Sequence, residues 1–281
     1  MIKDILVHIP TERSMRPVTD ASISLAVTLG AHLDALALGY VSAGALAYVA
    51  DAGAAAVVAS AFDIEEERAA ERATIALSAF ETEARHACVS YACRSIVDFP
   101  AEAAATIGAA SRLYDLAVVL QPQADLQTFD DTIATEVLLQ AGGPVLFVPH
   151  IFRGAFKAKR IGICWDGSRL AARALKDARP FLAQADAVFA ISINAADNVP
   201  PGASPENLAK HLARAGLSVK LIDLPATRTE IQPSILSLAG DESLDMLVMG
   251  AYGHSRLREG ILGGVTREML QTMTVPTLMA H

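Results

Sequence analysis

Short apolar runs alternate along the chain with longer stretches in which apolar residues recur every three or four positions. In the second half, buried strands are predicted for RIGICWD, AVFAISI, LSVKLIDL, DMLVMG and VPTLMA. The spacing between them predicts helices over SRLAARALKDARPFLAQ, SPENLAKHLARAG, EIQPSILSLAGD and GVTREMLQTM. Strands that are apolar on both faces and alternate with helices indicate a parallel sheet covered on both sides. The pattern therefore predicts an α/β fold.

The chain also repeats itself. EVLLQAGGPVLFVP (136–149) resembles EMLQTMTVPTLMAH (268–281), with glutamate, leucine and proline at matching places. YDLAVVLQP (114–122) resembles LDMLVMGAY (244–252), and KDILVHI (3–9) resembles KRIGICW (159–165). Because the order is the same in both halves, we expect two copies of one domain, over residues 1–150 and 157–281, joined near His150–Lys159.

Two segments of the first half have no counterpart in the second. Phe62–Ala87 carries charges of both signs and predicts a long amphipathic helix with a solvated face. Ala35–Ala50 is uncharged over 16 residues, fewer than the roughly 20 that a membrane span needs. It predicts a buried strand followed by an alanine-rich helix. MIKDILVHIP shows no signal-peptide features, so we expect no membrane partner and a cytoplasmic location.

Composition narrows the function further. The net charge is −8 and no Lys/Arg-rich block occurs, which argues against a nucleic-acid partner. Cys88, Cys93 and Cys164 form neither a metal-binding spacing nor a disulfide framework, and this fits a reducing compartment.

The segment GAYGHSRLREGILGGVT (250–266) follows a predicted strand and is rich in glycine. In open α/β sheets, ligands bind beyond the carboxyl ends of the strands. Gly250 and Gly253 would allow a turn with positive φ and let backbone N–H groups face a ligand. Gly263 and Gly264 precede a helix expected from about Val265, whose N-terminus favours a phosphate. The spacing predicts two backbone anion sites separated by nine residues.

This spacing, G-x2-G-x9-G, resembles that of nucleotide-binding members of the universal stress protein family. VMGAYGHSRLREGILGGVTREML (248–270) resembles the family's fourth strand, phosphate loop and last helix, and ICWDGSRLAARAL (163–175) resembles its first strand, Asp-Gly-Ser turn and first helix. The final VPTLMA resembles its closing strand. The resemblance covers the chain as a tandem of two such domains and is stronger in the second half. It implies two open parallel-sheet domains of the adenine nucleotide α-hydrolase-like type.

The resemblance also implies a role for each matching residue. The backbone would flank adenine at Ile163, Cys164, Trp165 and Ile193 or Asn194. The ribose would lie against Met249 and Gly250, and Asp166 would bond the ribose or the metal–phosphate end. The phosphates would be held by Gly253, Gly263, Gly264, Val265 and Thr266, with His254 and Arg256 as further contacts. The implied cofactor is ATP, or else ADP or AMP, with or without Mg²⁺.

Other interpretations of these residues stay open. Asp166 and Ser168 are also suited to cap the following helix. Trp165 is equally compatible with the core, and His254 and Arg256 with a solvated loop.

One residue departs from the family's pattern. ATP-holding members have Ser or Thr directly after the last glycine, where this chain has Gly264. The missing hydroxyl corresponds to about 1–3 kcal/mol if the phosphate is charged. Thr266, in the first helical turn, is the candidate replacement.

The first copy lacks the features of this loop, which it has lost or never had. Leu120, Gln123 and Asp131 stand where the second copy has Gly250, Gly253 and Gly263. Asp130 and Asp131 open the last helix of this copy, where they could cap their own helix and would repel a phosphate. VHIPTERS also lacks the Asp-Gly-Ser turn. We therefore expect a degenerate domain in the first half.

The expected function is a stress-response regulator that binds an adenine nucleotide in its second half with little or no turnover. The sequence has no nucleophile elbow, P-loop lysine, paired carboxylates beside the glycines or metal-ligand cluster. A slow ATP hydrolase or pyrophosphatase and a ligand-free dimerisation scaffold are the alternatives. Pairing of the apolar closing strands PVLFVP and VPTLMA would make one chain an internal pseudo-dimer; a further homodimer stays open.

Overall fold

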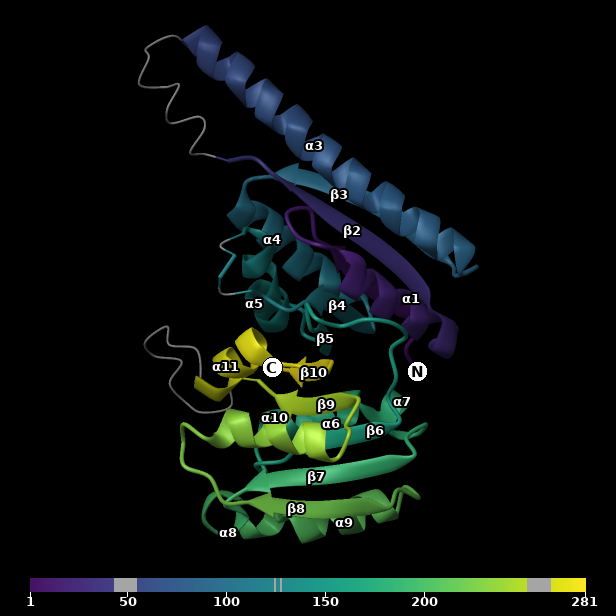
Figure 1. Ribbon diagram of the computed structural model, residues 1–281, viewed down its shortest axis with the longest axis vertical. Helices are drawn as coiled ribbons and strands as arrows, with labels where there is room; N and C mark the ends of the chain where they lie inside the picture. Colours follow the sequence, from purple (N-terminus) through teal and green to yellow (C-terminus); the bar gives the residue numbers. More distant parts are fainter. Residues whose placement is uncertain (43–54, 124, 127, 252–263) are drawn as a thin grey trace.

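The computed structural model describes residues 1–42, 55–123, 125, 126, 128–251 and 264–281. Within these residues the strands form one ten-stranded sheet in the order β3-β2-β1-β4-β5-β10-β9-β6-β7-β8 (Figure 1). The strands are β1 (Asp4–Ile9), β2 (His32–Tyr40), β3 (Tyr91–Asp98), β4 (Leu116–Leu120), β5 (Val145–Val148), β6 (Arg160–Cys164), β7 (Ala187–Ile193), β8 (Val219–Leu224), β9 (Met246–Gly250) and β10 (Thr277–Ala280). The helices are α1 (Arg16–Leu29), α3 (Ala55–His86), α4 (Pro100–Ala110), α5 (Asp130–Gln140), α6 (Arg169–Asp177), α7 (Arg179–Leu182), α8 (Ala195–Asn198), α9 (Pro205–Ala213), α10 (Ile231–Asp241) and α11 (Gly264–Thr272), with 3₁₀ turns η1 (Ser111–Leu113) and η2 (Pro201–Ala203).

The sheet has the same strand order on both sides of its middle. Outward from the centre it runs β5-β4-β1-β2-β3 in one direction and β10-β9-β6-β7-β8 in the other. Neighbouring strands are parallel within each half, as the sequence predicts. The two closing strands pair antiparallel, with Leu146 opposite Leu278, and join the halves into one mixed sheet. The predicted α/β fold is confirmed.

A small hydrogen-bond pattern recurs at matching places in both halves. Asp115, just before β4, accepts from the backbone N–H of Asp4 (3.1 Å) and returns its own N–H to the Asp4 carbonyl (2.9 Å). Asp245, just before β9, does the same with Arg160 at 3.0 Å and 3.0 Å. These aspartates are the ones that the repeat aligns.

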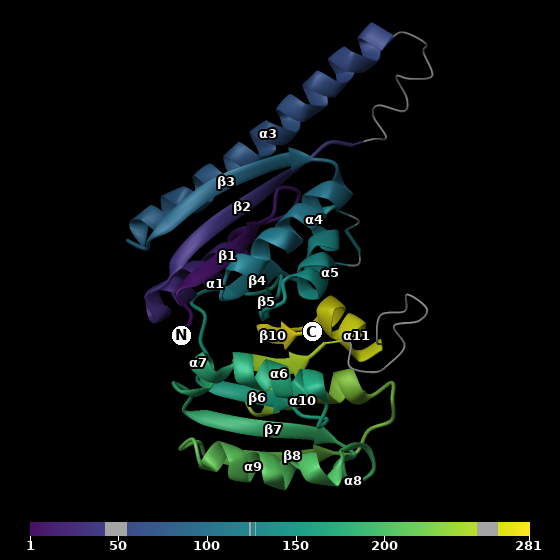
Figure 2. The same cartoon turned by 180° about the vertical axis from the view of Figure 1, so that it is seen from behind.

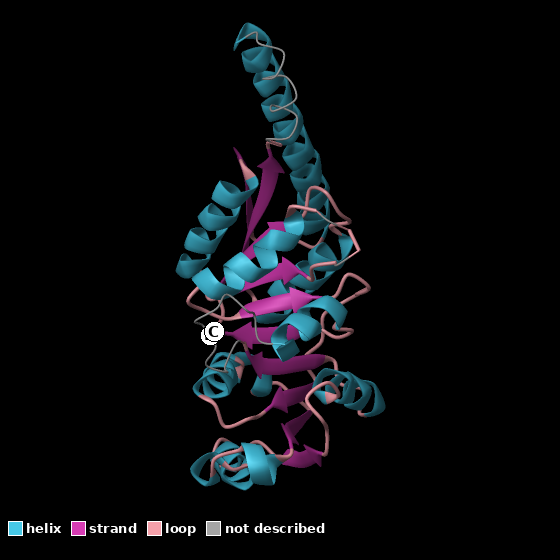
Figure 3. Cartoon of the chain, turned by 90° about the vertical axis from the view of Figure 1, so that its left-hand side faces the viewer, coloured by secondary structure: helices cyan, strands magenta, loops and turns pink. Residues whose placement is uncertain are grey.

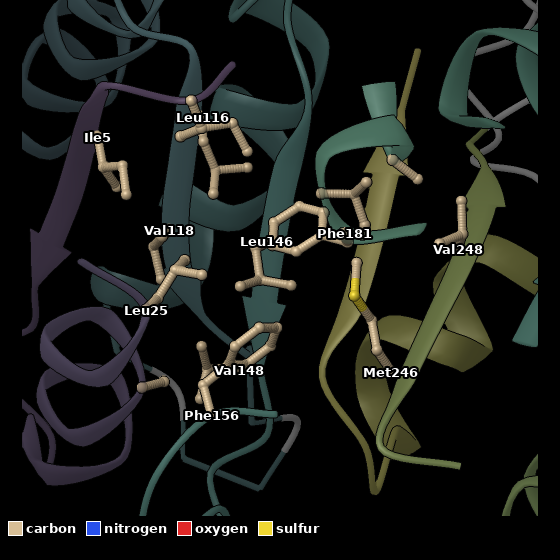
Figure 4. Close-up of a cluster of buried hydrophobic side chains, with 14 of the residues drawn as sticks. Ile5, Leu25, Leu116, Val118, Leu146, Val148, Phe156, Phe181, Met246 and Val248 are labelled. Carbon is tan, nitrogen blue, oxygen red and sulfur yellow. The ribbon is translucent and has the colours of Figure 1, made fainter. Parts of the chain in front are cut away.

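Helices cover both faces of the sheet (Figure 3). Residues of α1, α3, α6, α7 and α9 pack into one buried cluster, and residues of α4, α5, α10 and α11 into another. Each cluster draws residues from both halves. Figure 4 shows part of the first, with side chains from β1, β4 and β5 near Phe181, Met246 and Val248 of the second half. The core is therefore continuous across the antiparallel pair.

Local sequence signals explain where several helices begin and end. Ser204 caps α9 by accepting from the Asn207 N–H (3.3 Å), with Pro205 in the first turn. The single helix predicted over SRLAARALKDARPFLAQ is wrong in one respect, because it divides at Ala178 into α6 and α7. Pro180 has no N–H to continue the ladder of α6, which accounts for the break.

The long helix predicted from Phe62 to Ala87 is confirmed as α3 and begins earlier, at Ala55. One end of it projects beyond the sheet (Figure 1). The strand expected within Ala35–Ala50 is the second part of β2; the expected alanine-rich helix falls mostly on 43–54, outside the described residues.

The segment between the halves is packed against both of them. The N–H of Phe156 donates to Ser24 Oγ of α1 (2.8 Å). The buried Phe156 ring meets Phe181 of α7 edge-on, with 6.0 Å between ring centroids. The joining segment thus adds contacts between the halves besides the strand pair.

None of the helices in the described part of the chain combines the length and the apolar character that crossing a bilayer requires.

Candidate functional site

The carboxyl ends of β9, β6 and β7 lie side by side in the second half. The chain leaves β6 for β7 on one side and returns to β9 on the other, so the strand order reverses between β6 and β9. Such a reversal opens a crevice at the carboxyl edge, where ligands of open α/β sheets bind. The strands end there at Cys164, Ile193 and Gly250. The structure therefore brings the predicted strand-end residues to one edge.

Asp166 lies in the turn that leads from β6 into α6. It is exposed, and its Oδ1 accepts from the backbone N–H of Ser168 (2.9 Å). Ser168 Oγ in turn accepts from the N–H of Ala171 (3.1 Å) and caps α6. Gly167 between them has φ +70°, and a Cβ on it would lie 2.9 Å from Val199. Ser168 is the capping residue, while Asp166 shapes the turn and keeps an exposed carboxylate.

Gly250 is required by packing rather than by its backbone angle. The expectation of a positive φ is wrong, since Gly250 is not among the described glycines with positive φ. A Cβ at this position would lie 2.6 Å from Ala171 N and 2.6 Å from Leu170 C, which are backbone atoms of α6. Glycine thus lets the end of β9 approach the first turn of α6 at the carboxyl edge of the sheet.

Several predicted site residues place their side chains in the core. Ile163 and Met249 are buried, and Ile193 is half-buried against the cluster beneath α10 and α11. Trp165 is 8% exposed, and its indole Nε1 donates to the carbonyl of Ala203 (2.7 Å). The core interpretation of the Trp165 side chain is therefore confirmed. Only backbone atoms of these residues remain for the predicted contact with adenine.

Cys164 and Asn194 also have local structural roles. Burial, together with the charge of Asp166, raises the pKa of the Cys164 thiol to about 12, so the thiol is protonated and a poor nucleophile at neutral pH. Asn194 adopts a left-handed conformation (φ 48°), and its Nδ2 donates to the carbonyl of Ala226 (2.7 Å). The amide of Asn194 thus ties the end of β7 to the segment after β8.

The phosphate end of the predicted site is described in part. Gly264 is exposed at the start of α11, and among the atoms of described residues the nearest to a Cβ there would be Glu268 Oε1 at 3.9 Å. Val265 is half-buried, and Thr266 is 5% exposed. The predicted residues that lie outside the described ones are Gly253, His254, Arg256 and Gly263.

In the first half, a carboxylate of the chain itself lies at the corresponding edge. Asp130, the first residue of α5, is buried. Its Oδ2 accepts from the backbone N–H groups of Thr11 (3.1 Å) and Glu12 (2.9 Å), in the loop after β1. Its Oδ1 accepts from the hydroxyl of Tyr40 (2.9 Å), at the end of β2. The N–H groups that follow the first strand are thus satisfied from within the chain.

Asp131 closes the same edge from the other side. It forms an ion pair with the buried guanidinium of Arg13 (3.1 Å), and its Oδ1 accepts from the N–H of Gln123 (2.9 Å). The expectation that Asp130 and Asp131 cap their own helix is wrong, because no side chain caps α5. The two carboxylates bond the loops after β1 and β4 instead.

His8 was not singled out by the sequence, and it lies beside this carboxylate. It is 1% exposed, with Nε2 3.6 Å from Asp130 Oδ1. Burial and the nearby charge of Arg13 lower the pKa of His8 to about 3, so the imidazole is neutral at pH 7. The sequence feature that could have indicated a buried histidine is its place inside the apolar run ILVHI. The repeat aligns this position with Cys164.

No group of three or more His, Cys, Asp or Glu side chains is placed to hold a metal ion in the part of the chain that the structure describes.

The fold and this edge define a class: open α/β proteins with helices on both faces and a crevice at the strand reversal, as in the adenine nucleotide α-hydrolase-like fold. A universal stress protein from Archaeoglobus fulgidus has the same fold, with a TM-score of 0.71 at 16% identity, over 98% of this chain and 97% of that one. A functionally unknown protein of Pseudomonas aeruginosa, PA1789, has a TM-score of 0.62 at 16% identity, over 99% of this chain and 92% of that one.

Residues 157–281 match the sequence model of the Universal stress protein family. Universal stress protein MJ0577 of Methanocaldococcus jannaschii is 34% identical over 74 residues, 26% of this chain and 44% of that protein. Universal stress protein Slr1230 of Synechocystis is 28% identical over 74 residues, 24% of this chain and 26% of that protein. The similarity thus spans less than half the length of either relative. Residues 157–281 are thus similar to one universal stress protein domain.

Proposed function

We propose that this protein is a stress-response regulator that binds one adenine nucleotide, preferably ATP, in residues 157–281, with little or no turnover. The observation that carries the proposal is the contrast between the two carboxyl edges of one chain. In the second half, the edge has an exposed Asp166, and α11 begins at an exposed glycine. In the first half, the buried Asp130 occupies the equivalent edge.

The described residues fit a nucleotide at the second edge. The exposed carboxylate of Asp166 is suited to a ribose hydroxyl or a metal–phosphate group. Gly264 is exposed at the N-terminal turn of α11, whose dipole favours an anion such as a phosphate. Met249 and Gly250 would lie beside the ribose. The predicted contacts from Gly253, His254, Arg256 and Gly263 complete the proposal, and the Thr266 hydroxyl stays a predicted replacement for the missing Ser or Thr.

We also propose that residues 1–150 are a second, degenerate domain of the same type and that the chain is an internal pseudo-dimer. Support comes from the matching strand order, the equivalent bonds of Asp115 and Asp245, and the antiparallel pairing of β5 with β10. A cytoplasmic location is favoured by three free cysteines, since such thiols persist in reducing compartments.

Titration calorimetry with ATP and Mg²⁺ tests the site. We expect one nucleotide per chain and weaker binding by Asp166→Ala. Gly253→Val should lose binding, because the valine side chain blocks the approach of the phosphate to the backbone and adds about 1–3 kcal/mol of strain if φ is positive there. The matched control is Gln123→Val, at the equivalent position of the first half. Two nucleotides per chain, or full binding by the Gly253 variant, would exclude the assignment.

Two further measurements separate the alternatives. Mass spectrometry of freshly purified, denatured protein should find a co-purified adenine nucleotide, which a ligand-free scaffold would lack. A single-turnover assay with labelled ATP should release little phosphate or pyrophosphate; rapid release would identify an enzyme. For the pseudo-dimer, each half expressed alone should self-associate or melt at a lower temperature than the full chain.

A further inference from the structure

Helices α6, α7 and α9 lie in the second half (Figure 2), and residues of all three line one groove. Its volume is about 570 Å³, within the range of small-molecule pockets. It is lined by Trp165, Ala172, Leu175, Lys176, Arg179, Leu182, Ala183, Gly202, Ala203, Asn207, Leu208, His211, Leu212, Ala215 and Leu217. The groove lies between the helices, whereas the proposed nucleotide site lies at the carboxyl edge of the sheet.

The floor of the groove is apolar. Leu175 and Leu182 line it from α6 and α7, and Leu208 and Leu212 line it from α9; all four are buried in one cluster. The Trp165 ring also faces it, and the single polar atom of that ring is already hydrogen-bonded. An occupant must therefore bring an apolar body.

The rim of the groove is basic. Lys176, Arg179 and His211 are exposed on facing elements, and none of the described lining residues is acidic. The side chains of Arg179 and His211 form no hydrogen bond or ion pair with any residue that the structure describes. Lys176 differs from these two, because its charge interacts with that of the neighbouring Asp177. Two cationic or hydrogen-bonding side chains thus stand above an apolar floor without an internal partner, which favours an anionic head group.

The described part of the first half differs in the corresponding connection. The described helix between β2 and β3 is α3, which has 32 residues, against nine in α9. The side chains of Leu25 on α1 and of Ala73 and Phe80 on α3 are fully or almost fully buried in one cluster. Buried side chains of α1 and α3 thus pack together in the described part of the first half, whereas α6, α7 and α9 line a groove in the second.

We propose that the groove binds a single-tailed carboxylate, such as a medium-chain fatty acid. The acyl chain lies on the leucines and Trp165, and the carboxylate is held by Arg179 and His211 at the rim.

Trp165 is the single tryptophan of the chain, so its fluorescence reports directly on the groove. Titration of the full chain with octanoate should change Trp165 emission saturably, at concentrations below micelle formation. Octan-1-ol, which has the same chain length and no charge, should bind about fivefold more weakly or worse. The variant Arg179→Gln/His211→Gln should reduce octanoate binding to the level of octanol and leave octanol unchanged.

Matched variants decide the outcome. Arg214→Gln removes an exposed charge next to α9 outside the groove and should bind octanoate like the wild type. Ala172→Phe fills the groove from α6 and should abolish the response, with circular dichroism confirming the fold. Equal binding of octanol and octanoate, or unchanged binding by the Arg179/His211 variant, overturns the proposal. Self-association of the wild type that Ala172→Phe abolishes, measured by sedimentation, would identify a second copy as the occupant and also overturn it.

Discussion

The buried carboxylate of Asp130 gives the sharpest test of how the first half is held together. Asp130→Ala removes the acceptor for the Tyr40 hydroxyl and for the N–H groups of Thr11 and Glu12. Tyr40 is 1% exposed, so water cannot replace the lost partner at its hydroxyl. The two N–H groups are half-buried and can be hydrated in part.

The expected cost follows from these differences in burial. An orphaned buried hydroxyl costs about 1–3 kcal/mol, and the net loss of each backbone bond is about 0.5–1.5 kcal/mol. Burial raises the pKa of Asp130, which means that its ionised form is itself disfavoured in the fold, and its removal recovers part of the loss. We expect Asp130→Ala to lower the free energy of unfolding by about 2–4 kcal/mol.

A double-mutant cycle with Tyr40→Phe isolates the hydroxyl. In the Tyr40→Phe background no hydroxyl is orphaned, so Asp130→Ala should cost about 1–2 kcal/mol less than in the wild type. Urea unfolding at pH 7, followed by circular dichroism and by Trp165 fluorescence, measures all four proteins. Asp125→Ala, an exposed aspartate in the same segment, is the control and should stay within about 0.5 kcal/mol of the wild type. The reasoning would be refuted if the costs of the two single substitutions added up to that of the double variant within about 0.5 kcal/mol. It would also be refuted if Asp130→Ala were as stable as the wild type.

Three further predictions concern single residues. Burial lowers the pKa of His8 to about 3, so the free energy of unfolding should fall as the pH drops from 6.5 toward 3, by up to about 1.4 kcal/mol per pH unit. In His8→Leu the urea midpoint should therefore decline less between pH 7 and pH 5 than in the wild type. An equally steep decline in the variant would contradict this. Gly250→Ala places a Cβ 2.6 Å from the backbone of α6 and should lower the free energy of unfolding, measured by thermal denaturation, by about 1–3 kcal/mol. The control is Gly240→Ala, whose added Cβ has no described atom within 4 Å and should not destabilise the protein. Trp165→Phe removes the bond to the Ala203 carbonyl and should lower the free energy of unfolding by about 1–3 kcal/mol in chemical denaturation, a result that a wild-type midpoint would rule out.

Much of the fold could be predicted because its signals are local. The cap at Ser204 and the proline after it fix the start of α9, and the apolar runs fix the strands. The early start of α3 was missed, because the alanine-rich residues before Phe62 carry no clear helical period. The helix divides at Ala178 because of Pro180, although the apolar residues keep their helical spacing across the break.

The candidate site was predicted less completely, because its details depend on contacts distant in sequence. The sequence pattern predicts that glycine is needed at position 250. The structural cause is the close approach of α6, which lies some 80 residues earlier in the chain. His8, Tyr40 and Asp130 come from three separate segments, and nothing in the order of residues indicates that they meet. Only the folded sheet brings such groups together.

The antiparallel pair between β5 and β10 has a consequence for how the two halves can diverge. In a dimer of identical chains, one substitution changes both copies at once, and assembly depends on protein concentration. Here the same junction is intramolecular, so its formation does not weaken on dilution. Each half also has its own stretch of gene, and Asp131 can arise in one half while Gly263 is kept at the matching position of the other. Covalent linkage thus permits different side chains at the equivalent edges of a sheet whose strand order is symmetric, as the buried Asp130 and the exposed Asp166 at the two carboxyl edges illustrate.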